Sequence, residues 1–271
     1  MNPDKNDNVI QQRRIRIDVA YDGTAYAGWQ VQPELVSVQQ RLEETFAGVV
    51  GHSVKIHGSG RTDRGVHAKC QVAHLDVTTR IADISLQRAV NSRIAPDIRV
   101  TRLITVAPDF HARRSAHGKE YRYFVWCGEI MPPEKRLYAT HCHHLLDVPA
   151  MSKAAQWFVG THDFAAFSAN PQREIDTTVR TIFKFTVTGR GPQVTFAVQG
   201  NGFLYKQVRS MVGFLMRVGV GAERPDAVKE LLDAANPRVA RVPSAQPQGL
   251  FLWRVWYGGS RVRVHPGKNP R

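Results

Sequence analysis

The sequence has few cysteines, a deficit of acidic residues and no long apolar segment. Its three cysteines, Cys70, Cys127 and Cys142, are too few and too scattered for a disulfide framework. No apolar run approaches the ~18 residues of a membrane-spanning helix, and residues 1–14 lack the apolar stretch of a signal peptide. We therefore expect a soluble cytoplasmic protein with a disordered lead-in at residues 1–13.

Motifs for common cofactors are also missing. The sequence has no P-loop and no dinucleotide-binding glycine fingerprint after a strand. Residues 141–144, His-Cys-His-His, are the only metal-like cluster, and metal binding is one interpretation of them. Alternation along a strand would place His141 and His143 on one side, and Cys142 and His144 on the other. No ligand set with a recognised spacing accompanies them, so we expect no metal and no organic cofactor.

The charge balance points to a polyanionic partner. Of the 271 residues, 37 are Lys or Arg and 23 are Asp or Glu, which gives a net charge of +14 and a pI near 10.1. An excess of this size indicates either a nucleic acid or an acidic membrane surface as the partner. The apolar fraction, 42%, is enough for the core of one large domain or two small ones.

Hydrophobic periodicity predicts two similar halves. Residues 14–20 alternate as a half-buried strand, and Ser37 with Gln40 forms a capping box at the start of a helix. The remaining elements expected in the first half are strands at 54–56, 70–77 and 98–106, and a helix at 84–94 capped by Asp83. Those expected in the second half are strands at 121–126, 179–187, 194–198 and 250–257, and helices at 148–159, 204–218 and 226–234.

The predicted fold is α+β, with two related β-α-β-β-α-β halves of ferredoxin or RRM type. They cover residues 14–110 and 111–258, and residues 259–271 form a basic tail. We expect the two sheets to lie side by side around a central basic cleft, because ligand sites are commonly built in such concave surfaces.

One stretch combines glycines with charged side chains at a strand end. Residues 57–68 read His-Gly-Ser-Gly-Arg-Thr-Asp-Arg-Gly-Val-His-Ala, so Asp63 lies between Arg61 and Arg64. Nearby positive charge favours the ionised carboxylate, and an ionised, oriented carboxylate can act as a nucleophile or a base. A plain hairpin turn with a surface ion pair is the alternative interpretation.

Residues 60–68, Gly-Arg-Thr-Asp-x-Gly-Val-His-Ala, resemble the signature loop of the TruA family of tRNA pseudouridine synthases. The one mismatch is Arg64, where the family usually has a small residue. A second stretch, 21–30, is similar to the family's Tyr-Asp-Gly-Thr-x-Tyr-x-Gly-Trp-Gln. The resemblance covers nearly the whole chain, 15–257. It implies that Asp63 is the catalytic residue and that Arg61 is associated with the flipped nucleotide.

A third match opens the second half. Residues 119–123 resemble the family's Lys-x-Tyr-x-Tyr motif, and the resemblance implies that Tyr121 packs on the target base and assists its deprotonation. A free phenol has a pKa of about 10, so action as a base would need nearby positive charge. A strand with one solvated face would account equally well for the alternation of tyrosines with charges.

Residues 203–213 resemble the family's Phe-Leu-Tyr-x-x-Val-Arg-x-x-Val-Gly, in which the arginine pairs with the catalytic aspartate. By this match Arg209 is the partner of Asp63. Lys206 lies on the same helical stripe as Arg209 and is a candidate tRNA-binding residue, although such a stripe is often only a solvated basic face. Gly249 and Leu250 match a later family motif whose proline is displaced here by one place, which implies that Leu250 forms an apolar wall of the pocket.

The resemblance implies an isomerase that converts uridine to pseudouridine at nucleotides 38, 39 and 40 of the tRNA anticodon stem-loop. It implies a homodimer, tRNA rather than a membrane as the partner, and no cofactor. The residues leave open whether Asp63 attacks C1′, attacks C6 or removes a sugar proton. We expect Arg64 at the cleft rim, on a tRNA phosphate. The alternatives are a non-catalytic RNA-binding protein with two RRM-like halves and a metal-dependent nuclease, although the chain has no carboxylate cluster.

Overall fold

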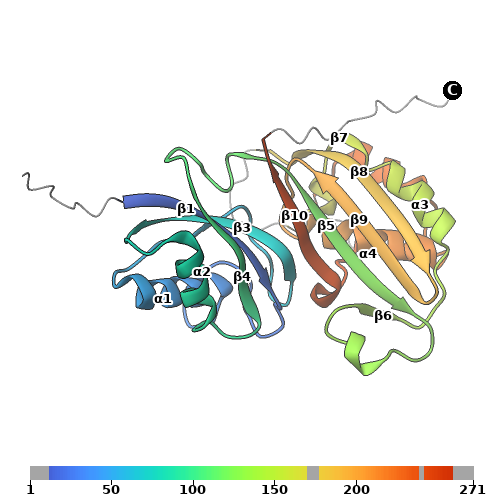
Figure 1. The fold of residues 1–271 in the computed structure, drawn as a ribbon. Helices are drawn as coiled ribbons and strands as arrows, with labels where there is room; N and C mark the ends of the chain where they lie inside the picture. The colour runs from blue at the N-terminus through green and yellow to red at the C-terminus, as the bar shows by residue number, and fades with distance from the viewer. Residues whose placement is uncertain (1–11, 170–176, 238–240, 259–271) are drawn as a thin grey trace, which may run out of the picture.

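The computed structural model describes residues 12–169, 177–237 and 241–258 (Figure 1). The strands are β1 (Gln12–Tyr21), β2 (His57–Gly58), β3 (His67–Thr78), β4 (Ile98–Val106), β5 (Ala116–Cys127), β6 (Thr140–Cys142), β7 (Gly160–Asp163), β8 (Val179–Arg190), β9 (Gln193–Gly200) and β10 (Leu250–Tyr257). The α-helices are α1 (Val38–Val50), α2 (Asp83–Asn91), α3 (Val148–Gln156), α4 (Gln207–Gly219) and α5 (Ala227–Ala234). The lead-in and tail expected at the chain ends lie outside the described residues, except Gln12 and Arg13, which belong to β1.

One mixed sheet runs through both halves of the molecule. Its main path has the order β4-β1-β3-β10-β5-β9-β8-β7, with β2 on β3 and β6 on β5. Along β4-β1-β3-β2 and along β10-β5-β9-β8-β7 the strands pair antiparallel, whereas β6 pairs parallel with β5. Parallel pairing of β3 with β10 joins the halves, where His67 lies opposite Phe251 and Ala68 opposite Leu252. The expected α+β class is confirmed, and the two sheets expected side by side are joined edge to edge into this one sheet.

The helices pack against this sheet through buried side chains. Ser37 is the N-cap of α1 and its hydroxyl accepts the backbone N–H of Gln40, which confirms the predicted cap. Helix α4 is the most deeply packed helix, and Met211, Phe214 and Leu215 have no exposed surface. A buried helix of this kind fixes the direction of the side chains that leave its polar edge. Within the described ranges, no helix is long and apolar enough to cross a bilayer.

Two local predictions are wrong, and long-range partners explain both. Residues 54–56 are not a strand, because side chains of α1 satisfy the backbone of Ile56: its N–H donates to Glu43 and its C=O accepts from Gln39. Only His57 and Gly58 pair with β3. Asp83 does not cap α2 but is its first helical residue. Its carboxylate instead accepts the backbone N–H of Thr105 at 2.7 Å.

The protein should lose stability in mild acid because β3 contains a buried histidine, His74. His74 is 3% exposed, stacks on His57 and packs against His111, and its Nδ1 accepts the backbone N–H of Ala112. Burial, followed by the positive charge of neighbouring groups, lowers its pKa to about 4. In the unfolded chain the His74 imidazole therefore binds a proton near pH 6.5, whereas in the folded chain it stays neutral until the pH falls to about 4. The free energy of unfolding should be unaffected by this group above pH 6.5 and fall by up to about 3 kcal/mol between pH 6.5 and 4.

Urea unfolding at a series of pH values measures this effect. His74→Gln should flatten the slope of unfolding free energy against pH in that window, and the exposed His144→Gln should leave the slope as in wild type. An unchanged slope in His74→Gln would show that folding does not lower the pKa of His74.

Candidate active site

The candidate active site is built on the loop between β2 and β3. Asp63 closes a turn in which the backbone N–H of Val66 donates to its C=O. A second loop packs directly on this turn, since the N–H of Trp29 donates to the C=O of Thr62 at 3.1 Å. Gly28 has φ +103°, and a Cβ there would lie 2.4 Å from the same carbonyl. The similarity of residues 21–30 to the family therefore has a physical basis: only glycine lets the two loops approach so closely.

An ion pair between the two halves lies at the centre of the site. Arg209 Nη1 is 3.0 Å from Asp63 Oδ2, and the two side chains are only 12% and 20% exposed. The residues are 146 positions apart in sequence. Arg209 lies on the first turns of α4, and its Nε also donates to the C=O of Ala245 at 2.7 Å. Two fixed acceptors therefore hold the planar guanidinium in one orientation, as expected for a positioned rather than a solvated arginine.

Tyr121 lies beside this pair on β5. It is 7% exposed, and its ring packs edge-on against Phe203 at a centroid distance of 5.1 Å. Burial raises the pKa of the phenol above its ordinary value, and the charge of Asp63 raises it further. The positive charge that a phenolate would require does not dominate here, so the ring stays a neutral phenol at physiological pH. This favours a packing role and opposes the role of a base.

The other predicted site residues are three basic side chains that reach the surface and one buried leucine. Arg61 and Arg64 are exposed on the signature loop, residues 60–68; Arg61 Nε donates to Gln30 at 3.2 Å, whereas Arg64 makes no hydrogen bond or ion pair with the described residues. Lys206 has φ +58° at the N-terminus of α4, and its ammonium lies 5.1 Å from the ring of Tyr205. Leu250 is 5% exposed and lies opposite Tyr123 in the pairing of β10 with β5.

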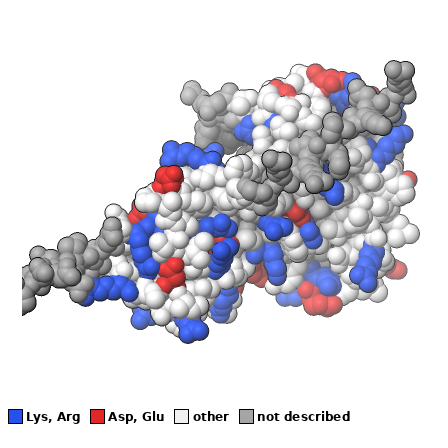
Figure 2. All heavy atoms as spheres, turned by 45° about the horizontal axis from the view of Figure 1, so that its top comes forward, with Lys and Arg blue, Asp and Glu red and all other residues white. Residues whose placement is uncertain are grey.

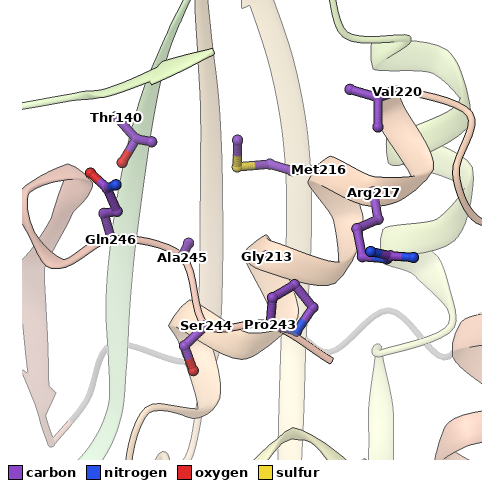
Figure 3. Close-up of a pocket in the computed structure, with 9 residues that line it drawn as sticks. All are labelled: Thr140, Gly213, Met216, Arg217, Val220, Pro243, Ser244, Ala245 and Gln246. Atoms are coloured by element: carbon purple, nitrogen blue, oxygen red, sulfur yellow. The ribbon is translucent and has the colours of Figure 1, made fainter. Parts of the chain in front are cut away.

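The segment before β10 supports both partners of the ion pair. The backbone of Ala245 exchanges two contacts with Arg209, one to its C=O and one to its guanidinium. The displaced proline, Pro247, packs on the signature loop, where a Cβ on Gly65 would lie 3.2 Å from its ring. Although this proline lies one place later than in the family motif, it still contacts the signature loop. A hollow of about 320 Å³ opens beside the segment (Figure 3), but Asp63, Tyr121 and Arg209 do not line it.

Sequence reasoning missed one contact at the edge of the signature loop. Lys119 Nζ donates to the C=O of Ser59 at 2.6 Å, and it occupies the space beside Gly60. Lys119 precedes Tyr121 by two positions, so strand alternation places both on the same face of β5. The Lys-x-Tyr spacing was the signal that would have found it.

The described residues contain no group of three or more His, Cys, Asp or Glu side chains arranged to hold a metal ion. His141 and His143 do lie together, with ring centroids 4.1 Å apart, but His141 Nε2 donates to the C=O of Gly128. Cys142 is buried at the pairing of β6 with β5. Lys and Arg side chains occur over both halves of the face in Figure 2, with fewer Asp and Glu among them.

Comparison with known proteins assigns this site to a class. A family model described as tRNA pseudouridine synthase matches residues 154–258, which include α4 and β10. The protein "tRNA pseudouridine synthase A" of Exiguobacterium sibiricum is 43% identical over 252 residues, covering 93% of this chain and 100% of that one. Proteins of the same name from Maridesulfovibrio salexigens and Limosilactobacillus fermentum are 43% and 44% identical over 249 residues each. These cover 91% and 90% of this chain, and 91% and 96% of their own lengths.

The family model and the relatives thus define a pseudouridine synthase, an isomerase that acts on tRNA. The chain belongs to the tRNA pseudouridine synthase A family, as the signature loop predicted. A chain in the crystal structure of a Cbf5-Nop10-Gar1 complex aligns with 75% of this chain and 54% of its own length, at 14% identity and a TM-score of 0.32. That likeness is too distant to inform the site.

Proposed function

We propose that the protein isomerises uridine to pseudouridine in the anticodon stem-loop of tRNA, at nucleotides 38, 39 and 40, with Asp63 as the nucleophile. The ion pair of Asp63 with Arg209 supports this proposal, because it holds a carboxylate ionised and oriented at the junction of the two halves. Arg209 binds Oδ2. Oδ1 accepts no hydrogen bond from the described residues, and so it is the oxygen left for attack on the nucleotide.

The reaction depends on how the protein positions the uridine and needs no co-reactant. The N1–C1′ bond breaks, the uracil turns within the site, C5 bonds to C1′ and Asp63 is released unchanged; the proton that leaves C5 to a base is balanced by one taken up at N1. No atom is gained or lost overall, so the proposal requires no oxidant and no group donor. The target base must first leave its stack, which costs a few kcal/mol. We assign Arg61, on the rim of the loop, to fill the space that the flipped base leaves in the stack, because arginine stacks on bases.

Tyr121→Phe should separate packing from proton transfer. The phenylalanine ring would keep the edge-on contact with Phe203, so the Kd for tRNA should change less than about twofold. Because burial and Asp63 keep the phenol neutral, we expect turnover to fall by less than about tenfold. Single-turnover assays that follow N1–C1′ cleavage and the formation of pseudouridine separately would measure this. Complete loss of product with cleavage intact would instead assign the C5 proton to the Tyr121 oxygen.

Arg64→Ala should weaken tRNA binding through a phosphate contact. Arg64 is exposed beside Asp63 and does not compete with Arg209 for the carboxylate. Loss of one phosphate contact should lower the slope of log affinity against log salt by about 0.7–0.9. We expect KM to change more than kcat. Arg88→Ala, an exposed arginine on α2 beside the edge strand β4, is the matched control and should keep the wild-type slope. An unaltered slope for Arg64→Ala would leave this arginine a surface charge only.

Incubation with unmodified tRNA in a chelating buffer tests the proposal against its rivals. Pseudouridine mapped at nucleotides 38 to 40 supports it, binding without conversion would indicate an RNA-binding protein, and strand cleavage abolished by the chelator would indicate a nuclease. The binding-only rival needs exposed aromatic platforms on the third strand of each half. Along β3 and β9 the one Phe, Tyr or Trp is Phe196, which is 1% exposed.

The proposal extends to assembly and location. We propose a homodimer, which the family resemblance implies and which sedimentation of the purified protein would test. We also propose a cytoplasmic location. Cys70, Cys127 and Cys142 are all free thiols, as is usual in a reducing compartment.

A further inference from the structure

A buried glutamine of β3, Gln71, bonds the main chain where the signature loop begins. The side chain has no exposed surface. Its Oε1 accepts the hydroxyl of Ser59 at 2.7 Å and the backbone N–H of Val72 at 3.2 Å. Its Nε2 donates to the C=O of Gly60 at 2.8 Å. Both ends of one amide therefore hold two successive residues, 59 and 60, on the way to the catalytic carboxylate.

The chemistry of these partners determines which end of the amide faces which partner. A backbone N–H can only donate and a backbone C=O can only accept, so the oxygen of Gln71 faces Val72 and its nitrogen faces Gly60. An ionised carboxylate or a thioether of similar size could not serve both. Burial of an amide is unfavourable unless its hydrogen bonds are made. The bonds to the loop offset that cost here, so Gln71 is not interchangeable with an apolar core residue.

The rest of the main chain leading to Asp63 is held in a similar way. Lys119 reaches across from the second half and donates to the C=O of Ser59 at 2.6 Å. Thr62 directly precedes Asp63, and its hydroxyl lies 2.8 Å from that of Tyr21 in a buried contact. Buried hydrogen-bond networks whose members are satisfied make a segment rigid. The chain therefore arrives at Asp63 with its position already fixed.

We propose that Gln71 is a positioning residue for the reaction, because its hold on Ser59 and Gly60 sets where the main chain presents the Asp63 carboxylate to the nucleotide. This inference rests on the proposed role of Asp63. Arg209 holds the carboxylate itself from the second half, and Gln71 holds the main chain that carries it from the first. A displacement of about 1 Å can cost a catalytic group a hundredfold in rate, so release of the loop should reduce turnover.

Gln71→Met tests this proposal, because methionine is of similar length and adapts to the same space but makes neither hydrogen bond. The single-turnover rate constant should fall by about ten- to a hundredfold. The Kd for tRNA should stay within about threefold of wild type, since phosphate contacts dominate RNA affinity. The urea midpoint should also fall, because buried polar groups lose their partners. A wild-type rate constant, or weaker tRNA binding with an unchanged rate constant, would overturn the proposal.

Gln39→Met is the matched control. Gln39 is also buried, and it also serves one backbone donor and one backbone acceptor: its Oε1 accepts the N–H of Val31 at 3.1 Å, and its Nε2 donates to the C=O of Ile56 at 3.0 Å. Neither partner lies within residues 59–63. The urea midpoint should fall about as far as in Gln71→Met, while the rate constant stays within about twofold of wild type. Equal losses of rate in the two variants would overturn the proposal, since Gln71 would then act through stability alone.

Ser59→Ala takes the place of Gln71→Met if that variant does not fold. It removes only the hydroxyl bonded to Gln71 and leaves the bond to Gly60. The rate constant should fall by about three- to tenfold at a wild-type Kd, and an unchanged rate constant would overturn the proposal.

Conversion of uridine by wild type and by Asp63→Asn is measured first. An inactive wild type or an active Asp63→Asn would refute the proposed function, and this inference with it. When wild type converts uridine and Asp63→Asn does not, a wild-type rate constant in Gln71→Met refutes this inference alone.

Discussion

Asp63→Asn should abolish turnover while leaving the fold and the affinity for tRNA nearly unchanged. The amide has almost the same shape as the carboxylate, but it is neither nucleophilic nor basic at neutral pH. We expect kcat to fall by at least about a hundredfold. The Kd for tRNA should stay within about threefold of wild type, since the phosphate contacts that dominate RNA affinity are untouched. Single-turnover assays with excess enzyme would measure the chemical step, and filter binding the affinity.

Asp76→Asn is the matched control for this prediction. Asp76 also pairs with an arginine, Arg14, at 2.7 Å, but it lies near the other end of β3. At about 3.3 Å per residue, the nine positions of β3 from His67 to Asp76 carry Asp76 well away from the site. The control should therefore lose a little stability and keep full turnover. Activity of Asp63→Asn above a few per cent of wild type would refute the nucleophile assignment.

Arg209→Ala should nearly abolish turnover and also destabilise the protein. The substitution removes the partner of Asp63 and the donor to the Ala245 carbonyl, so a partly buried carboxylate loses its orientation. We expect kcat to fall by at least about a hundredfold, because the Asp63 carboxylate would no longer be held in its reactive orientation. The free energy of unfolding should fall by about 1–3 kcal/mol. Steady-state assays and urea unfolding would measure the two effects.

Two further variants separate charge from geometry. Arg209→Lys keeps the charge, but an ammonium lacks the planar fork that reaches both acceptors, so its turnover should recover only in part. Arg217→Ala, eight residues later on α4, removes a pair with Glu223 and should affect stability without affecting kcat. If Arg209→Ala were silent in both assays, the arginine would be part of a solvated helix face and the ion pair would have no catalytic role.

The local features of this protein were accessible from its sequence. The Ser37 cap and the turn around Asp63 include contacts between near neighbours, and the apolar run at residues 250–257 is visible in the sequence itself. The net charge of +14 likewise indicated a polyanionic partner before any contact was known. The same local logic failed at residues 54–56 and at Asp83, where side chains from other elements took the hydrogen bonds.

The sequence by itself determined the two-half order of elements, the candidate catalytic carboxylate and the family. Only the tertiary structure decided what meets that carboxylate. The parallel pairing of β3 with β10 brings Asp63 to Arg209 across 146 residues, and the pairing of β10 with β5 brings Lys119 to Ser59 across 60 residues. Pattern and propensity describe the chain one neighbourhood at a time. Contacts between halves depend on strand register and on the packing of buried side chains, which no single neighbourhood contains.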